Sequence, residues 1–307
     1  MYNLNPQYWF EDVSVLAELP AAKIAEKLRE MEDSETAEWF DGLDEQIYAA
    51  AGREKLLWID KPWQHTEVAF GYIPPKPNAK DVVEIKHAGN MRADDSLKNA
   101  RIKVTLDRLR VADYPGKGMH HILFDFYAQN QLKDHVEDIH FNQTYQAQEG
   151  EQASIIGYPV FIGLNVGLEG VIFKCMTVNV KNDNDEAVLN FLDQDIFQAC
   201  LKLATTVQPA IAPLTSMAIG LTKMIAKRNK NVPVQKFYMG LDFSNVATRA
   251  RLAPGSYIAV QIPNCDWDWR EWVYNPTNGR IVKQDDLSAL IPYNYIVFGV
   301  SKYEESE

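Results

Sequence analysis

The chain has 307 residues, of which 46% are hydrophobic and 24% charged, and its formal net charge is −11. This composition is typical of a soluble globular protein and excludes wholesale disorder. The length exceeds that of one ordinary core, so a domain with an appendage, or two domains, is expected. The acidic balance excludes a fold-wide basic surface for nucleic acid, because binding to phosphates needs clustered Lys and Arg.

The first residues and the cysteines together predict a cytoplasmic protein. "MYNLNPQYWFEDVSVLAELP" has no basic head, no long apolar stretch and no small-residue cleavage site, so it does not resemble a secretory signal. Cys175, Cys200 and Cys265 lie far apart and form neither a metal-type pair nor a disulfide framework. Such cysteine usage favours a reducing compartment.

Residues 1–75 are predicted to form a helical N-terminal region. In "AAKIAEKLREME", Ile24 and Leu28 are four residues apart, as on one face of a helix. A second helical pattern follows in "DSETAEWFDGLDEQIYAAAG". Residues 76–99 are predicted to be a linker, because they begin within a proline-rich stretch and lack hydrophobic periodicity.

Residues 100–307 are predicted to form an antiparallel β-sandwich of about eight strands. Ile102, Val104 and Leu106 alternate with polar residues in "RIKVTLDRLRV", and similar alternation recurs to the end of the chain. Two β-rich runs flank Gly167–Gly170, which predicts a hairpin there. Because the strand patterns are separated by turns rather than by helices, the predicted fold class is mainly β.

An α-helical hairpin at about residues 194–230 is predicted as an insertion that packs on the sandwich. Uncharged residues fill the interval from Lys202 to Lys223, but Pro209 and Pro213 divide it, so a membrane span is not expected. The predicted helices cover residues 194–207 and 213–228. The second of them places four apolar side chains together: Leu214, Met217, Leu221 and Met224.

Four cations gather at the end of the second predicted helix: Lys223, Lys227, Arg228 and Lys230. They have two interpretations. The cations complement the negative end of the helix dipole, or they form the basic part of an amphipathic surface that binds anionic lipid or an acidic partner.

Two segments resemble the β-sandwich domain of calpains, which belongs to the wider class of calcium- and phospholipid-binding sandwiches. "RLAPGSYIAVQIP", residues 251–263, is similar to the leucine, proline, glycine, aromatic and alternating-strand pattern of that domain. "RIKVTLDRLRVADYPGKG", residues 101–118, is similar to its first strand and loop. The resemblance implies a sandwich whose loops at one end contact calcium or lipid.

The resemblance also implies a candidate calcium site. Calcium takes six to eight oxygen ligands, which several short acidic loops can supply together. Solvated surface loops have the same composition, and "YPGKGMHH" lacks the second aspartate that the first loop of such a site carries. The candidate ligands are Asp113, Asp183, Asp185, Asp266 and Asp268.

The segment "CDWDWREWVY" has an unusual density of aromatic residues, with Trp267, Trp269, Trp272 and Tyr274 in close succession. Exposed, these rings would form a platform on which a sugar or the apolar groups of a partner stack. Buried, they would be large core residues whose indole N–H groups need acceptors.

The sequence contains neither a nucleophile elbow nor a phosphate-binding or dinucleotide-binding motif, so it favours a non-enzymatic role. The function expected is an intracellular binding or adaptor protein whose sandwich binds a protein partner, a second copy of itself, or an anionic membrane surface. One alternative is a carbohydrate- or small-ligand-binding sandwich that uses the Trp cluster. The other is a hydrolase of unrecognised type with a Cys/His site. No cofactor other than calcium is expected.

Overall fold

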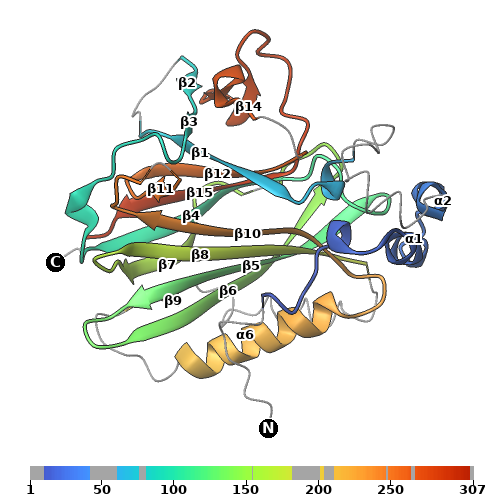
Figure 1. Cartoon of the computed structure of the whole chain (residues 1–307), viewed down its shortest axis with the longest axis horizontal. Helices are drawn as coiled ribbons and strands as arrows, with labels where there is room; N and C mark the ends of the chain where they lie inside the picture. Colours follow the sequence, from blue (N-terminus) through green and yellow to red (C-terminus); the bar gives the residue numbers. More distant parts are fainter. Residues whose placement is uncertain are drawn as a thin grey trace.

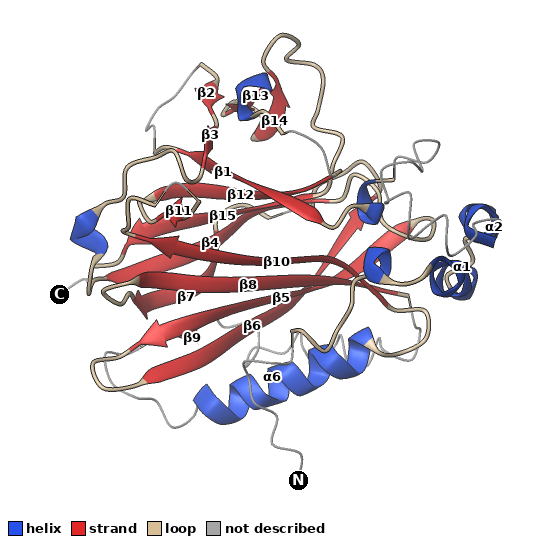
Figure 2. Ribbon diagram, viewed as in Figure 1, coloured by secondary structure: helices blue, strands red, loops and turns tan. Residues whose placement is uncertain are grey.

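The computed structural model describes residues 10–41, 61–75, 81–153, 155–181, 201–203, 211–246, 248–263 and 267–304. Strands dominate these residues, and almost all of their pairings are antiparallel (Figures 1 and 2). The predicted mainly-β fold class is therefore confirmed. The strands are more numerous than the eight that were predicted.

The largest sheet has seven strands in the order β3-β1-β12-β15-β4-β7-β9. Its β1 pairs antiparallel with β12, with Glu67 opposite Ile262. Only the short β7–β9 pairing in this sheet is parallel. The strands are β1 (Glu67–Ile73), β3 (Lys86–His87), β4 (Arg101–Arg110), β7 (Tyr158–Asn165), β9 (Leu201–Lys202), β12 (Gly255–Ile262) and β15 (Tyr295–Lys302).

The second sheet has five strands in the order β11-β10-β8-β5-β6, and a third, small sheet has the order β14-β13-β2. The strands of the second sheet are β5 (Met119–Gln131), β6 (Val136–Gln148), β8 (Gly170–Val180), β10 (Val232–Asp242) and β11 (Ala250–Arg251). Those of the small sheet are β2 (Val83–Glu84), β13 (Trp272–Asn275) and β14 (Arg280–Lys283).

Helices lie outside the sheets. The described α-helices are α1 (Ala21–Glu30), α2 (Ser34–Asp41) and α6 (Ile211–Ala226), and short 3₁₀ turns are η1 (Leu16–Glu18), η3 (Pro62–Gln64), η4 (Asp95–Leu97) and η6 (Trp269–Glu271). Figure 1 shows α6 and the small sheet on opposite sides of the two larger sheets.

The structure corrects four local predictions. Glu67–Ile73, expected in the helical region, forms β1, and the expected linker contains β2 and β3. Leu201–Lys202, expected in the first helix of the hairpin, is strand β9, and the rest of that helix before residue 201 lies outside the described residues. The runs that flank Gly167–Gly170 do not pair, because β7 and β8 belong to different sheets.

Phenylalanine rings pack between the two larger sheets. The ring centroids of Phe126 on β5 and Phe173 on β8 are each 5.5 Å from the ring centroid of Phe298 on β15. The Phe126 ring also stacks on Phe173 at 5.4 Å. All three side chains are at most 1% exposed. The two sheets therefore share one aromatic core, and α1 adds Ile24 and Leu28 to it.

Strand β12 is buried on both faces. Tyr257 and Ala259 point into the shared core, whereas Ile258, Val260 and Ile262 belong to a separate cluster beneath the small sheet. The sequence of a strand that is buried on both faces is a nearly continuous run of apolar residues. The alternation expected of a strand with one solvated face is correspondingly weak in "SYIAVQI".

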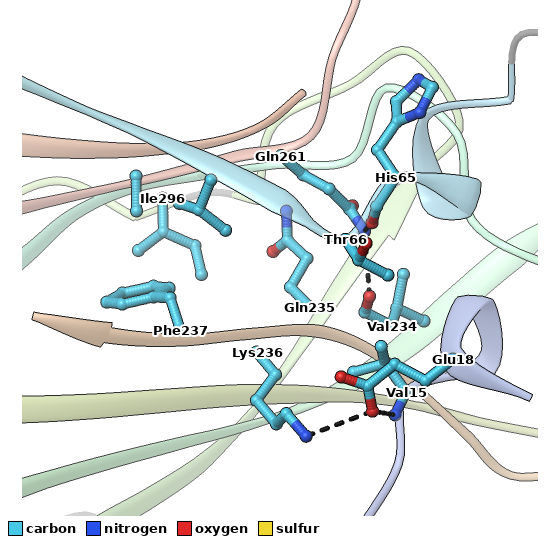
Figure 3. A pocket seen from close by; sticks show the side chains of 12 residues that line it. Val15, Glu18, His65, Thr66, Val234, Gln235, Lys236, Phe237, Gln261 and Ile296 are labelled. Carbon is cyan, nitrogen blue, oxygen red and sulfur yellow. Dashed lines mark hydrogen bonds and ion pairs between the residues drawn. The ribbon is translucent and has the colours of Figure 1, made fainter. Parts of the chain in front are cut away.

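An amide network joins β12 of the largest sheet to β10 of the second sheet (Figure 3). The Gln261 side chain donates to the backbone oxygens of His65 and Val234, at 2.6 and 3.1 Å. Its own oxygen accepts from Asn294 at 3.0 Å. The register of β10 shifts beside Val234, between Pro233 and Gln235. The adjoining cavity measures only about 20 Å³, so it is a packing gap rather than a ligand site.

We predict that Phe126→Ala lowers the free energy of unfolding by about 3–5 kcal/mol, because the truncation leaves a cavity where the two sheets meet. Urea-induced unfolding measures this change. Leu287→Ala is the control, since Leu287 is 50% exposed and its truncation should change stability by less than about 0.5 kcal/mol. Equal losses in the two variants would contradict the shared core.

Candidate functional site

The four aromatic residues predicted as a platform come together in the cluster beneath the small sheet. The Trp267 ring lies parallel to Trp272 at 5.7 Å and edge-on to Trp269 at 5.4 Å. Trp269 and Trp272 are 5% and 9% exposed, and Tyr274 is half-buried. Because the rings pack on one another and on the large sheet, they do not present a joint stacking surface.

The Trp cluster leaves two polar atoms without partners. The indole N–H groups of Trp267 and Trp269 are buried and have no hydrogen-bond acceptor among the described residues. Trp269 also explains a glycine on β1, since a Cβ on Gly71 would lie 2.8 Å from its indole ring. The cluster therefore attaches the small sheet to the large one by close packing.

The predicted basic residues surround the C-terminal end of α6, but the structure assigns them different contacts. Lys223 forms an ion pair with Asp12 at 2.6 Å. The Arg228 guanidinium contacts the Met224 sulfur at 3.7 Å, and the Lys230 backbone N–H donates to Glu30 at 3.3 Å. Lys227 is exposed. One lysine is thus paired within the fold and another faces solvent, and both interpretations of these cations stay predictions.

Helix α6 turns its methionines outward. Met217 and Met224 are 39% and 38% exposed, whereas Ile219 and Ile225 are buried against β5 and β8. Two members of the predicted apolar stripe are thus on the solvent side, and Leu221 is only partly buried. The fourth member, Leu214, lies outside the side chains that the structure describes.

A hydroxyl group on the inner face of α6 belongs to a buried network of hydrogen bonds. Thr222 donates to Asp125 Oδ2 at 2.7 Å, and Asn142 donates to both Asp125 and Thr222. His140 Nδ1 lies 3.2 Å from Asp125 Oδ1. All four side chains belong to residues that are at most 5% exposed. Because the helix covers them, they orient α6 on the sheet rather than meet a substrate.

The sequence pattern does not predict this network. Asp125 interrupts the apolar run "ILFDFYA" on β5, and that interruption is the one signal that pointed to it. A buried carboxylate needs several donors. The partners of Asp125 lie on β6 and α6, which are distant from β5 in sequence. The spacing of these residues along the chain therefore does not indicate that they contact Asp125.

The predicted calcium ligands do not converge in the described part of the chain. Asp113 forms an ion pair with Lys61 at 2.8 Å, and Asp268 with Arg270 at 2.7 Å. Asp183, Asp185 and Asp266 lie outside the described residues. Among those described, no three His, Cys, Asp or Glu residues are grouped as metal ligands. Calcium binding stays a prediction.

The predicted Cys/His site is likewise unassembled where the structure can be described. Cys175 is 1% exposed in β8, and burial raises the pKa of its thiol. A thiol with a raised pKa is a poor nucleophile. Cys200 and Cys265 lie outside the described residues.

Comparison with other proteins does not assign a family. No family model matches the chain, and neither a curated protein nor a solved structure matches it. Among the helices that can be described, none combines the length and apolarity needed to cross a membrane.

We predict that Thr222→Val lowers the free energy of unfolding by about 1–3 kcal/mol, because the buried Asp125 and Asn142 side chains each lose a hydrogen bond. Chemical denaturation followed by circular dichroism measures the loss. Ser216→Ala, on the exposed side of the same helix, should change stability by less than about 0.5 kcal/mol. A neutral Thr222→Val variant would show that the network does not hold α6.

We predict a pH dependence from Asp113. Burial raises the pKa of this carboxyl from 3.8 to about 6, against the opposing effect of Lys61 and with a further increase from Glu149. The folded state therefore holds the proton more tightly than the unfolded state, and this contribution to stability is lost as the pH rises from about 4 to about 6.

Comparison with Asp113→Asn isolates the effect. The unfolding free energy of the wild type, minus that of the variant, should fall over this pH interval when both are measured by urea titration at each pH. A difference that instead rises with pH would mean that the Lys61 ion pair outweighs burial.

Proposed function

We propose that the protein is a non-enzymatic binding protein that recognises a protein partner through the outward face of α6. This face consists of Met217, Gly220, Leu221 and Met224, with Lys227 at its end. The observation that carries the proposal is the exposure of both methionines on a helix whose buried side contains threonines. In this proposal, the two larger sheets form a cytoplasmic β-sandwich that serves as a scaffold.

The spacing of the outward face suits an apolar contact. Residues 217, 220, 221 and 224 follow the i, i+3, i+4, i+7 pattern that places side chains on one side of a helix. Methionine is unbranched and polarizable, so it adapts to varied apolar surfaces and is common at binding sites. A partner that covers this face would remove Met217 and Met224 from water.

The charges at the end of the face favour an acidic partner. Lys227 is exposed and lies one helical turn beyond Met224 and Lys223. The chain as a whole carries a net charge of −11, so a local group of cations is distinctive. Complementary charge speeds association and selects among partners. The partner inferred is therefore an apolar surface bordered by carboxylates.

The support beneath α6 makes the face rigid. Ile219 and Ile225 pack against Leu123, Met176 and Val178 of the sheet. Thr215 donates to the backbone oxygen of Asp138 at 3.1 Å, and Thr222 is held by Asp125. A surface that is ordered before binding loses less entropy when the partner arrives.

The test identifies the partner and then measures its affinity. Benzoylphenylalanine placed at position 217 is photo-cross-linked in cells, and the protein it captures is purified. We predict that the double variant Met217→Glu/Met224→Glu binds this partner at least about tenfold more weakly in calorimetry, because it places two carboxylates in an apolar contact. Leu287→Glu, an exposed substitution elsewhere, should bind like the wild type.

Two outcomes would overturn the proposal. One is unchanged affinity of the double variant. The other is flotation of the wild type with phosphatidylserine vesicles that is lost on charge reversal of Lys223, Lys227, Arg228 and Lys230, which would assign the face to a membrane. Weaker partner binding at high salt supports the acidic character of the partner.

A further inference from the structure

A row of small and hydroxyl-bearing residues crosses three neighbouring strands of the large sheet. Ser256 on β12 lies opposite Gly299 on β15, and Gly299 lies opposite Thr105 on β4. The middle position of this row has no side chain. A Cβ there would lie 2.5 Å from Thr105 Oγ1 and 2.9 Å from Asp107 Oδ2, so any larger residue would displace these side chains.

Asp107 occupies the hollow that Gly299 leaves. In the β4–β15 pairing, Leu106 is opposite Phe298 and Arg108 is opposite Val297, so Asp107 is the extra residue of a β-bulge. Bulges redirect a side chain and are frequent beside functional sites. This bulge brings the carboxylate over the glycine and between the two hydroxyl groups.

The hydroxyl groups donate to the carboxylate. Thr105 Oγ1 donates to Asp107 Oδ1 at 2.7 Å, and Ser256 Oγ donates to Oδ2 at 3.1 Å. Each hydroxyl has one proton, which this contact uses, and each keeps a lone pair. The hollow therefore offers hydrogen-bond acceptors from three side chains. Burial raises the pKa of Asp107, and both hydroxyl contacts oppose that rise.

The hollow adjoins an open groove of about 360 Å³ between the small sheet and the large sheet. Thr105, Ser256 and Gly299 line this groove, and the Asp107 carboxylate contacts the two hydroxyl groups from outside the lining. Val83 of β2 and Tyr274 of β13 line the groove from the small sheet, which Figure 1 shows beside the large sheet. Four prolines are also among the lining residues: Pro74, Pro75, Pro254 and Pro276. A volume of this size accommodates a small ligand, and an aromatic ring beside a carboxylate suits a cation.

The cations of the fold do not neutralise this carboxylate. Arg108 donates to the backbone oxygens of Gly279, Ile155 and Asp107. Arg108 and, more weakly, Lys103 act on Asp107 through space and lower its pKa. Within the described residues, no lysine or arginine forms an ion pair with the Asp107 carboxylate.

We infer that this groove binds an organic cation, a guanidinium or ammonium group that donates to the Thr105 and Ser256 hydroxyl oxygens beside Tyr274, with the Asp107 carboxylate behind these hydroxyl groups supplying the negative charge. This site is separate from the outward face of α6, which lies on the opposite side of the sheets (Figure 1).

Calorimetry with three probes tests the inference. Agmatine represents a free cation, N-acetyl-arginine amide represents an arginine of a peptide, and N-acetyl-citrulline amide is the uncharged counterpart of the second probe. We predict that at least one cationic probe binds at least about tenfold more tightly than the citrulline probe. Tighter binding of agmatine would indicate a free metabolite as the ligand, and tighter binding of N-acetyl-arginine amide would indicate a peptide.

Variants with opposite effects separate binding from folding. Asp107→Asn should weaken binding of the cation at least about tenfold, whereas Lys103→Met should strengthen it by removing a like charge. Asp286→Asn, an exposed aspartate elsewhere, should leave the affinity unchanged. Equal affinity for all three probes, or a loss of binding in Lys103→Met as large as in Asp107→Asn, would overturn the inference.

Discussion

The contact among Phe126, Phe173 and Phe298 is the one on which the rest of the structure depends. These rings lie in one large buried cluster that both sheets share, and the pair of Phe70 and Phe237 is a further aromatic contact between the sheets. Large buried aromatic rings contribute much of the apolar area removed from water in a core. Each sheet also has an outer face that points away from this core, and different elements cover the two outer faces.

One outer face is covered by α6 and the other by the small sheet. Beneath α6 the contact includes a buried carboxylate, so the position of the helix depends on hydrogen-bond geometry as well as on apolar area. Beneath the small sheet the contact is a cluster of tryptophans. Both covers leave part of the sheet accessible, and the groove lined by Thr105 and Ser256 lies between the small sheet and the large sheet.

Alternation of apolar and polar residues predicted the mainly-β class and several strands, such as β4, correctly. Periodicity also located α1 and α6 closely. It failed at Gly167–Gly170, because a short turn between strands does not reveal whether they pair or enter different sheets. The orientation of α6 was inaccessible for a related reason: its buried threonines, Thr222 and Thr215, donate to Asp125 and to the backbone oxygen of Asp138, which belong to other elements. Asp107 was not predicted either, since its surroundings are created by pairing of three separated strands.

The pairing of Glu67 with Ile262 places the first strand of the large sheet beside one made far later in synthesis. While the ribosome elongates the chain, β1 has an open edge and waits for β12 and β15 to emerge. Contacts so distant along the chain slow folding, and an unpaired edge invites association with other chains. The nascent protein is therefore most exposed to aggregation, and most in need of a chaperone, just before its last strands are released.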